Sequence, residues 1–286
     1  MNNVEQKQKT DMNPFEERKK EQEAIRQAMS SIKHIIAVGS GKGGVGKSTV
    51  AVNLAVCLAK EGYRVGLADA DVYGPSLPTL FNIDRTEILA TKQGDRELMV
   101  PVERYGIKLM SIGFMVDYSA PLMWRGPMAS NALKQLLSET HWGELDYLIL
   151  DMPPGTGDIQ LTLVQTFRPS GALFVCTPQQ LAVSDVRRAI NMFNNDQINI
   201  PILGLVENMA YFTPEELPNN KYYIFGKEGG KQLSKELNVD FLGQIPISCS
   251  VSQANDDGMP IALKDNAESK AFKVVADRIV EKLDKE

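Results

Sequence analysis

The sequence contains few of the side chains that bind metals through nitrogen or sulfur. It has three cysteines and two histidines in 286 residues. The cysteines, Cys57, Cys176 and Cys249, are far apart and form no C-x-x-C pair, so the usual spacing of a thiolate metal site is absent. Two histidines are too few for a histidine-rich site. Cys57 and Cys176 fall within a predicted helix and a predicted strand, and we expect both in the core.

Long apolar runs and an excess of positive charge are also absent. No stretch approaches the roughly 18 apolar residues that a membrane-spanning helix needs. The N-terminus is polar and mixed in charge, unlike a secretory signal. The net charge of −5 is the opposite of the basic surface expected of a nucleic-acid-binding protein. We therefore expect a cytoplasmic protein that binds neither membranes nor nucleic acids.

Short apolar runs alternate with helical patterns along most of the chain. The predicted strands cover residues 34–38, 64–68, 107–112, 147–150, 172–176 and 202–206. The predicted helices cover residues 128–137, 159–167, 179–193 and the region 272–283, and residues 85–105 are predicted to contain a small hairpin. This alternation indicates βαβ units. It predicts a three-layer α/β/α fold with a mostly parallel sheet that helices cover on both faces.

The chain is predicted to divide into a short leader and one large domain. Residues 1–30 are a polar leader in which Ile25 and Met29 share one helical face, so we expect a helix that leans on the body. With 43% hydrophobic residues, the remaining residues 31–286 suffice for one large core.

The stretch 41–49 reads GKGGVGKST and matches the phosphate-loop pattern G-x-x-x-x-G-K-[ST]. It follows an apolar strand-like run and precedes a helical pattern, which is the setting that the motif requires. Backbone N–H groups of such a loop surround phosphates at a helix N-terminus. Lys47 is expected to reach the β- and γ-phosphates of ATP, and the Ser48 hydroxyl to bind Mg²⁺. The predicted nucleotide-binding residues are Gly41, Lys42, Gly43, Gly44, Val45, Gly46, Lys47, Ser48 and Thr49.

Lys42 is unusual, because an ordinary phosphate loop needs no lysine at its second position. With Lys42, the loop resembles that of the deviant P-loop ATPases. The resemblance implies that this lysine reaches across a homodimer to the partner's nucleotide. A cation supplied in this way stabilises the charge that develops during phosphoryl transfer. Lys42 and Lys47 are thus candidate catalytic residues; a solvated surface lysine is the alternative for Lys42.

Three aspartates lie at the ends of predicted strands, where ligands of open α/β sheets bind. The resemblance to deviant P-loop ATPases implies that Asp71 orients or deprotonates the attacking water, with Asp69 as its partner or on the Mg²⁺ side. Asp151 closes an apolar strand in the Walker B pattern that holds Mg²⁺. The predicted metal ligands are Ser48, Asp71 and Asp151. Ordinary strand-end capping is the alternative for a single aspartate.

Two further segments contain candidate ligands of the nucleotide. Residues 151–158 read DMPPGTGD, which is typical of a switch segment in which the N–H of Gly155 approaches a γ-phosphate. A tight loop without a switching role is the alternative. Asn208 follows the apolar run 202–206, and its side-chain amide can pair with a donor and an acceptor on adenine.

Together, GKGGVGKST, DADVYGPS at 69–76, WRGP at 124–127 and DMPPGTGD make residues 32–265 similar to the Mrp/ApbC family of P-loop ATPases. Members of this family are similar in fold to the nitrogenase iron protein and to MinD. The resemblance implies a Mg²⁺-dependent homodimeric ATPase that carries an iron–sulfur cluster and transfers it to apoproteins.

The sequence departs from the family at the expected cluster ligands. The family usually has a C-x-x-C pair after its E-N-M segment, and Thr213 and Glu216 occupy about those positions here. Iron–sulfur clusters need soft thiolates. Cys249 is the remaining candidate, but one cysteine per subunit supplies only two ligands per dimer, and we favour a small buried or loop thiol as its interpretation. We therefore expect poor cluster binding by the protein alone.

Three functional hypotheses follow. The first is an ATP-hydrolysing carrier or assembly factor for iron–sulfur clusters. The second is a MinD-like switch, although the C-terminal helix lacks the basic polar face of a membrane-surface helix. The third is a regulatory ATPase of the same fold that binds no cluster.

Overall fold

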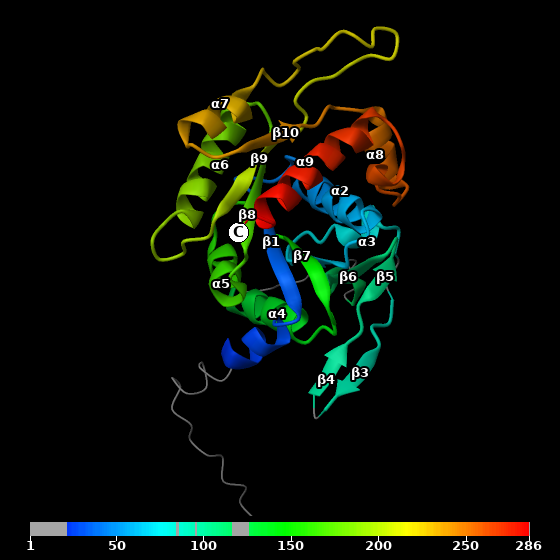
Figure 1. The fold of residues 1–286 in the computed structure, drawn as a ribbon, viewed down its shortest axis with the longest axis vertical. Coiled ribbons are helices and arrows are strands. Elements are labelled where there is room, and N and C mark those ends of the chain that lie inside the picture. Colours follow the sequence, from blue (N-terminus) through cyan, green and yellow to red (C-terminus); the bar gives the residue numbers. More distant parts are fainter. Residues whose placement is uncertain (1–21, 84–85, 95, 116–125, 286) are drawn as a thin grey trace, which may run out of the picture.

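The chain is described here from a computed structural model that covers residues 22–83, 86–94, 96–115 and 126–285. Its centre is an eight-stranded sheet with the strand order β10-β9-β8-β1-β7-β2-β6-β5, shown in Figure 1. All neighbouring strands are parallel except β5 and β6. The strands are β1 (Ile32–Ser40), β2 (Val65–Asp69), β5 (Val102–Arg104), β6 (Ile107–Ser111), β7 (Leu145–Asp151), β8 (Gly171–Cys176), β9 (Ile202–Glu207) and β10 (Phe241–Gln244).

Helices cover both faces of this sheet and enclose two hydrophobic cores. One face packs against α2 (Lys47–Lys60), α3 (Leu77–Leu80), α8 (Cys249–Asp256) and α9 (Ala267–Leu283). The other packs against α4 (Gly126–Ser138), α5 (Asp158–Phe167), α6 (Gln180–Phe193) and α7 (Gly229–Glu236). The α/β/α layering with a mostly parallel sheet confirms the predicted fold class.

Burial on both faces explains why the strands are apolar throughout rather than alternating. In β7, Tyr147 and Ile149 pack into one core, whereas Leu148 and Leu150 pack into the other. A strand covered by helices on both sides must be apolar at every position, which is the pattern that parallel sheets show.

Two smaller segments that the sequence singled out are partly described by the structure. The hairpin is formed by β3 (Ala90–Gln93) and β4 (Arg96–Met99), which pair antiparallel. Residues 22–28 of the leader are helical, and Ile25 and Met29 are buried in the second core. No helix in the described ranges is long and apolar enough to cross a bilayer.

The register of the central strands decides which loops meet. Val38 of β1 and Asp69 of β2 both pair with Asp151 of β7. Because these parallel strands end at the same edge, the phosphate loop after β1 lies at the same edge as the aspartates that close β7 and β2.

Candidate nucleotide-binding site

The phosphate loop connects β1 to α2 through a glycine-rich turn. Gly44 and Gly46 have φ angles of 77° and 80°, a left-handed conformation that glycine adopts without strain. Gly46 also has no room for a side chain, since a Cβ atom there would lie 2.1 Å from Asn208 Nδ2. The turn leads directly into the N-terminus of α2 at Lys47. This is the geometry of an anion-binding helix N-terminus.

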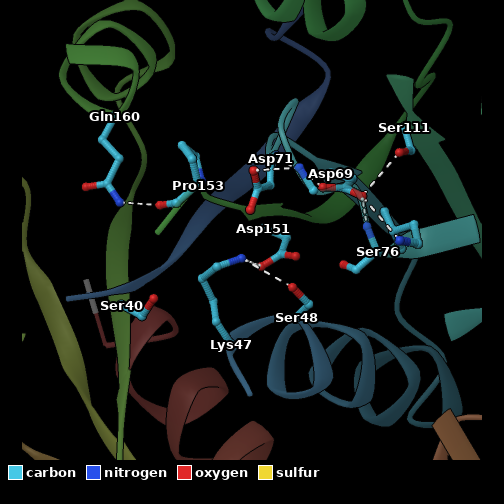
Figure 2. A network of polar contacts seen from close by, with 12 residues as sticks. Ser40, Lys47, Ser48, Asp69, Asp71, Ser76, Ser111, Asp151, Pro153 and Gln160 are labelled. Carbon is cyan, nitrogen blue, oxygen red and sulfur yellow. Dashed lines mark hydrogen bonds and ion pairs between the residues drawn. The ribbon is translucent and has the colours of Figure 1, made fainter. Parts of the chain in front are cut away.

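Lys47 and Asp151 form a buried ion pair at the centre of the site (Figure 2). Lys47 Nζ lies 2.5 Å from Asp151 Oδ1, and the two side chains are only 7% and 2% exposed. The Ser48 hydroxyl is 3.3 Å from the same ammonium group. The pair joins the first residue of α2 to the last residue of β7, so the structure brings these two predicted site residues together.

The oxygen atoms around Lys47 fit a magnesium ion. Asp151 Oδ2 is buried and has no hydrogen-bond partner among the described residues. It lies on the same side of the site as the Ser48 hydroxyl (Figure 2). Mg²⁺ prefers such hard oxygen ligands and is usually held by one or two protein groups together with substrate phosphates.

Asp71 lies beside this pair on the loop that follows β2. Its carboxylate Oδ1 accepts a hydrogen bond from the backbone N–H of Gly74 at 3.2 Å, and the side chain is half-buried. Burial raises the pKa of Asp71, while the nearby positive charge of Lys47 opposes that rise. A raised pKa suits a carboxylate that accepts a proton near neutral pH.

Asp69 shapes the loop that carries Asp71. Its fully buried carboxylate accepts hydrogen bonds from the backbone N–H groups of Asp71 (3.1 Å), Ser76 (2.8 Å) and Leu77 (3.2 Å) and from the Ser111 hydroxyl (3.1 Å). Burial and the neighbouring Asp151 raise its pKa. Because both carboxylate oxygens are engaged, these contacts favour a role in loop geometry over the predicted position on the Mg²⁺ side.

The segment after Asp151 is held by contacts that its sequence did not reveal. The N–H of Gly155 donates to the Ser40 carbonyl at 3.0 Å, so this segment touches the start of the phosphate loop. Gln160, in the first turn of α5, donates to the carbonyl of Pro153. In the sequence, only the position of Gln160, seven residues after Pro153, could have indicated this contact.

A cavity of about 560 Å³ lies between the loop after β2 and the segment after β7. Its lining residues are Asp71, Tyr73, Gly74, Gly126, Pro153, Pro154, Gly157, Asp158, Ile159 and Gln160. In the WRGP motif, Trp124 and Arg125 lie outside the described residues, while Gly126 and Pro127 begin α4. The loop after β2 and the predicted switch segment after β7 therefore face one cavity that Asp71 borders.

Asn208 contacts the phosphate loop directly. Its Nδ2 donates to the carbonyl of Val45 at 2.8 Å, and the side chain is 6% exposed. This contact uses one amide hydrogen and leaves Oδ1 available to an adenine amino group. The predicted base reader thus also supports the turn around Gly46.

The side chain of Lys42 has no ion-pair partner within the described ranges. The residue is partly exposed, and its contact to the body is made by its carbonyl, which accepts a hydrogen bond from the Ser40 hydroxyl at 2.9 Å. The ammonium group is therefore available for a contact outside this subunit.

The three cysteines differ in exposure. Cys57 and Cys176 are buried as expected, and burial raises the pKa of Cys57 to about 11 and also raises that of Cys176. Cys249 is exposed at the start of α8. In the described part of the chain, no three His, Cys, Asp or Glu side chains are grouped to hold a metal ion. A thiolate ligand on the surface can thus come only from Cys249.

The fold and this site define a P-loop nucleotide-binding protein. The family described as NUBPL iron-transfer P-loop NTPase, within the ParA group, matches residues 31–282, and the chain belongs to this family. It is 46% identical over 260 residues to the "Iron-sulfur cluster carrier protein" of Synechocystis, which covers 90% of this chain and 73% of that protein. A protein of the same name from Aquifex aeolicus is 50% identical over 255 residues, 88% of this chain and 68% of that protein.

Solved structures agree with this assignment. A nucleotide-binding protein from Archaeoglobus fulgidus, in complex with ADP, superimposes with a TM-score of 0.74 at 38% identity, covering 85% of this chain and 93% of that chain. The cell division ATPase MinD of Pyrococcus furiosus superimposes with a TM-score of 0.61 at 19% identity, covering 88% and 99%. The second match shows a shared fold.

Proposed function

We propose that the protein hydrolyses ATP and uses the cycle to carry iron–sulfur clusters to apoproteins. The buried Lys47–Asp151 pair at the head of the phosphate loop is the observation that supports the ATPase most directly. Membership of the NUBPL family, whose relatives are named cluster carriers, supports the cargo. We also propose that residues 31–286 form the ATPase domain and that the protein acts in the cytoplasm.

Each residue of the site has a separate role in hydrolysis. When ATP binds, Lys47 leaves its ion pair with Asp151 and contacts the β- and γ-phosphates. Bound Mg²⁺, held by Ser48 and Asp151, would neutralise charge on the phosphates. Asp71 accepts a proton from the water whose oxygen attacks the γ-phosphorus, and the bond to the β-phosphate oxygen breaks to give ADP and phosphate. Gly155 donates its N–H to the γ-phosphate in place of Ser40, and Asn208 binds the adenine.

The active form is a homodimer in which Lys42 acts on the partner's nucleotide. Mixing Lys42→Ala subunits with Asp71→Asn subunits, each inactive alone, tests this arrangement. In the heterodimer, one of the two sites has its own Asp71 and receives Lys42 from the other chain. We expect a steady-state ATPase assay to show recovery of up to about a quarter of the wild-type rate per subunit, since random pairing makes half of the dimers mixed and half of their sites complete.

The control is a mixture of Lys42→Ala with the double variant Lys42→Ala/Asp71→Asn, which offers no complete site. No recovery in a mixture shown by native mass spectrometry to contain heterodimers would contradict action across the dimer.

In this proposal, binding of the iron–sulfur cluster depends on Cys249. We expect anaerobic reconstitution with iron and sulfide to give low, labile loading in the wild type and less in Cys249→Ser, because two thiolates per dimer leave other cluster positions to weaker ligands. Iron counting and visible absorption measure the difference, and Cys57→Ser is the matched control with a buried thiol. Equal loading near zero in all three proteins would favour the MinD-like or regulatory ATPase instead.

A further inference from the structure

The segment between β9 and α7 extends away from the body as an arm, defined here as residues 211–228 and seen at the top of Figure 1. At its base, Phe212 and Tyr222 exchange two backbone hydrogen bonds of 2.8 Å, and Phe212 also pairs with Ile247. Beyond the base, residues 215–224 are all exposed. The arm is therefore anchored at one end and open to solvent over the rest of its length.

The exposed part of the arm contains large apolar side chains. Leu217, Tyr222, Tyr223 and Ile224 are 48%, 47%, 36% and 60% exposed. Four such residues in eight positions are more than scattered surface hydrophobics and indicate a contact with another molecule. Tyrosine is also among the side chains that contribute most at protein interfaces.

The arm is ordered by local contacts before any partner binds. The N–H of Leu217 donates to Pro214, and that of Asn220 donates to Leu217, so two turns form its tip. Tyr211 packs edge-on against Tyr223, with ring centroids 6.4 Å apart. A preformed segment loses less conformational entropy on binding than a flexible one.

Charge divides the arm into two limbs of opposite sign. The outgoing limb carries Glu215 and Glu216, and the returning limb carries Lys221 and Lys227. Glu228, the last residue of the arm, is paired with Lys231 of α7 at 2.8 Å, so the returning limb remains basic. Within the described ranges Glu215, Glu216, Lys221 and Lys227 form no ion pair. The two lysines lie over the tyrosine rings of their own arm, Lys221 at 3.9 Å from Tyr211 and Lys227 at 5.0 Å from that of Tyr223.

This pattern is complementary to itself. If two arms lie antiparallel about a two-fold axis, each acidic limb meets a basic limb, and the apolar residues between them are covered. Interfaces related by a two-fold axis need such self-complementarity, because the same patch is used on both subunits.

The arm leaves the body at the edge of the sheet that holds the phosphate loop. It begins three residues after Asn208, and Asn208 contacts Val45 of that loop. Lys42 lies in the phosphate loop at this edge of the sheet. A second copy whose nucleotide is contacted by Lys42 must therefore also approach the arm of the same subunit.

We propose that the arm docks against the arm of a second copy of this chain, outgoing limb on returning limb. This inference rests on the proposed homodimer. The expected cysteine pair is missing from this region. The two subunits would instead meet there in a protein–protein contact that needs no metal.

Charge reversal with rescue tests the pairing. The acidic limb is reversed in Glu215→Lys/Glu216→Lys and the basic limb in Lys221→Glu/Lys227→Glu, and each full-length variant is examined by sedimentation equilibrium with Mg²⁺ and AMP-PNP. We expect the dimer dissociation constant of each variant alone to rise about tenfold or more, because like charges then face each other. An equimolar mixture should recover wild-type dimerisation, since acidic limbs meet basic limbs again in the heterodimer.

Further variants separate this contact from general effects of charge and folding. Lys92→Glu/Lys285→Glu changes the net charge by the same amount as the reversal of the basic limb, at exposed positions on β3 and beyond α9, and should dimerise as the wild type does. Tyr222→Ser/Ile224→Ser should weaken the dimer without a charge change. AMP-PNP binding by each variant shows that its nucleotide site is folded.

Two results would overturn the proposal. Unchanged dimerisation in both reversed variants would remove the arm from the dimer contact, while the Lys42 mixing experiment could still succeed. Weakened dimers that do not recover in the mixture would place the arm against another surface of the partner. A monomeric wild type at every concentration would contradict both the arm contact and the proposed homodimer.

Discussion

Lys47→Ala is expected to abolish stable binding of Mg·ATP. The substitution removes the positive charge that the phosphate loop directs at the phosphates, and hydrogen bonds from a charged donor contribute about 1.5–3 kcal/mol each. Loss of two such contacts corresponds to a dissociation constant higher by about 100-fold or more. Isothermal titration calorimetry measures the change, and unchanged affinity in the folded variant would show that the phosphate loop is wrongly assigned.

The same substitution should also destabilise the fold, which needs its own control. Lys47→Ala leaves the carboxylate of Asp151 buried without its partner, a change that costs about 3–5 kcal/mol in buried pairs. Lys47→Ala/Asp151→Asn removes the unpaired charge, so urea unfolding should show most of the stability restored. Mg·ATP affinity should stay low in the double variant, because neither substitution returns a cation to the loop.

Asp71→Asn is expected to bind Mg·ATP nearly as well as the wild type and to hydrolyse it about 10²–10⁴-fold more slowly, the usual contribution of general-base catalysis. An amide oxygen can still accept the N–H of Gly74, so the loop should keep its shape. The amide has no basic oxygen to take the proton of the attacking water. Single-turnover hydrolysis together with nucleotide titration separates the two effects.

Two aspartate variants define the specificity of this result. Asp158→Asn changes a carboxylate that lines the same cavity and should leave turnover within a few-fold of the wild type. Asp151→Asn should first raise the Mg²⁺ concentration needed for activity, because it removes a metal ligand. Joint loss of binding and turnover in Asp71→Asn would instead assign Asp71 a structural or metal-holding role.

Much of the fold could be predicted because its signals are local. A strand buried on both faces must be apolar at every position, so β1, β7 and β8 are visible as continuous runs in the sequence. The phosphate loop is equally local, since its glycines, Lys47 and the following helix are adjacent in the chain. The short helices α3, α7 and α8 were missed, because four to eight residues make at most about two helical turns. Strand β10 was missed because its sequence, FLGQ, contains only two apolar residues in a row before Gly243 and Gln244.

The environment of individual side chains could not be read in the same way. Nothing near Asp69 in sequence indicates that its carboxylate binds the Ser111 hydroxyl from a neighbouring strand. The sequence predicts Asn208 as a base reader, but its contact with Val45 joins residues that are 163 positions apart. Both contacts depend on the order of the strands in the sheet, which places β6 beside β2 and β9 two strands from β1.

The sequence by itself determined the chemistry available to this protein: a phosphate loop, strand-terminal carboxylates, an additional lysine and no C-x-x-C pair. Each is a local pattern whose meaning depends on residues next to it in the chain. The tertiary structure alone decided how these groups meet, by pairing β1, β7 and β2 so that Lys47 contacts Asp151 and Asp69 holds the loop of Asp71. It also left Cys249 and the arm on the surface, because exposure depends on packing between segments that are distant in sequence.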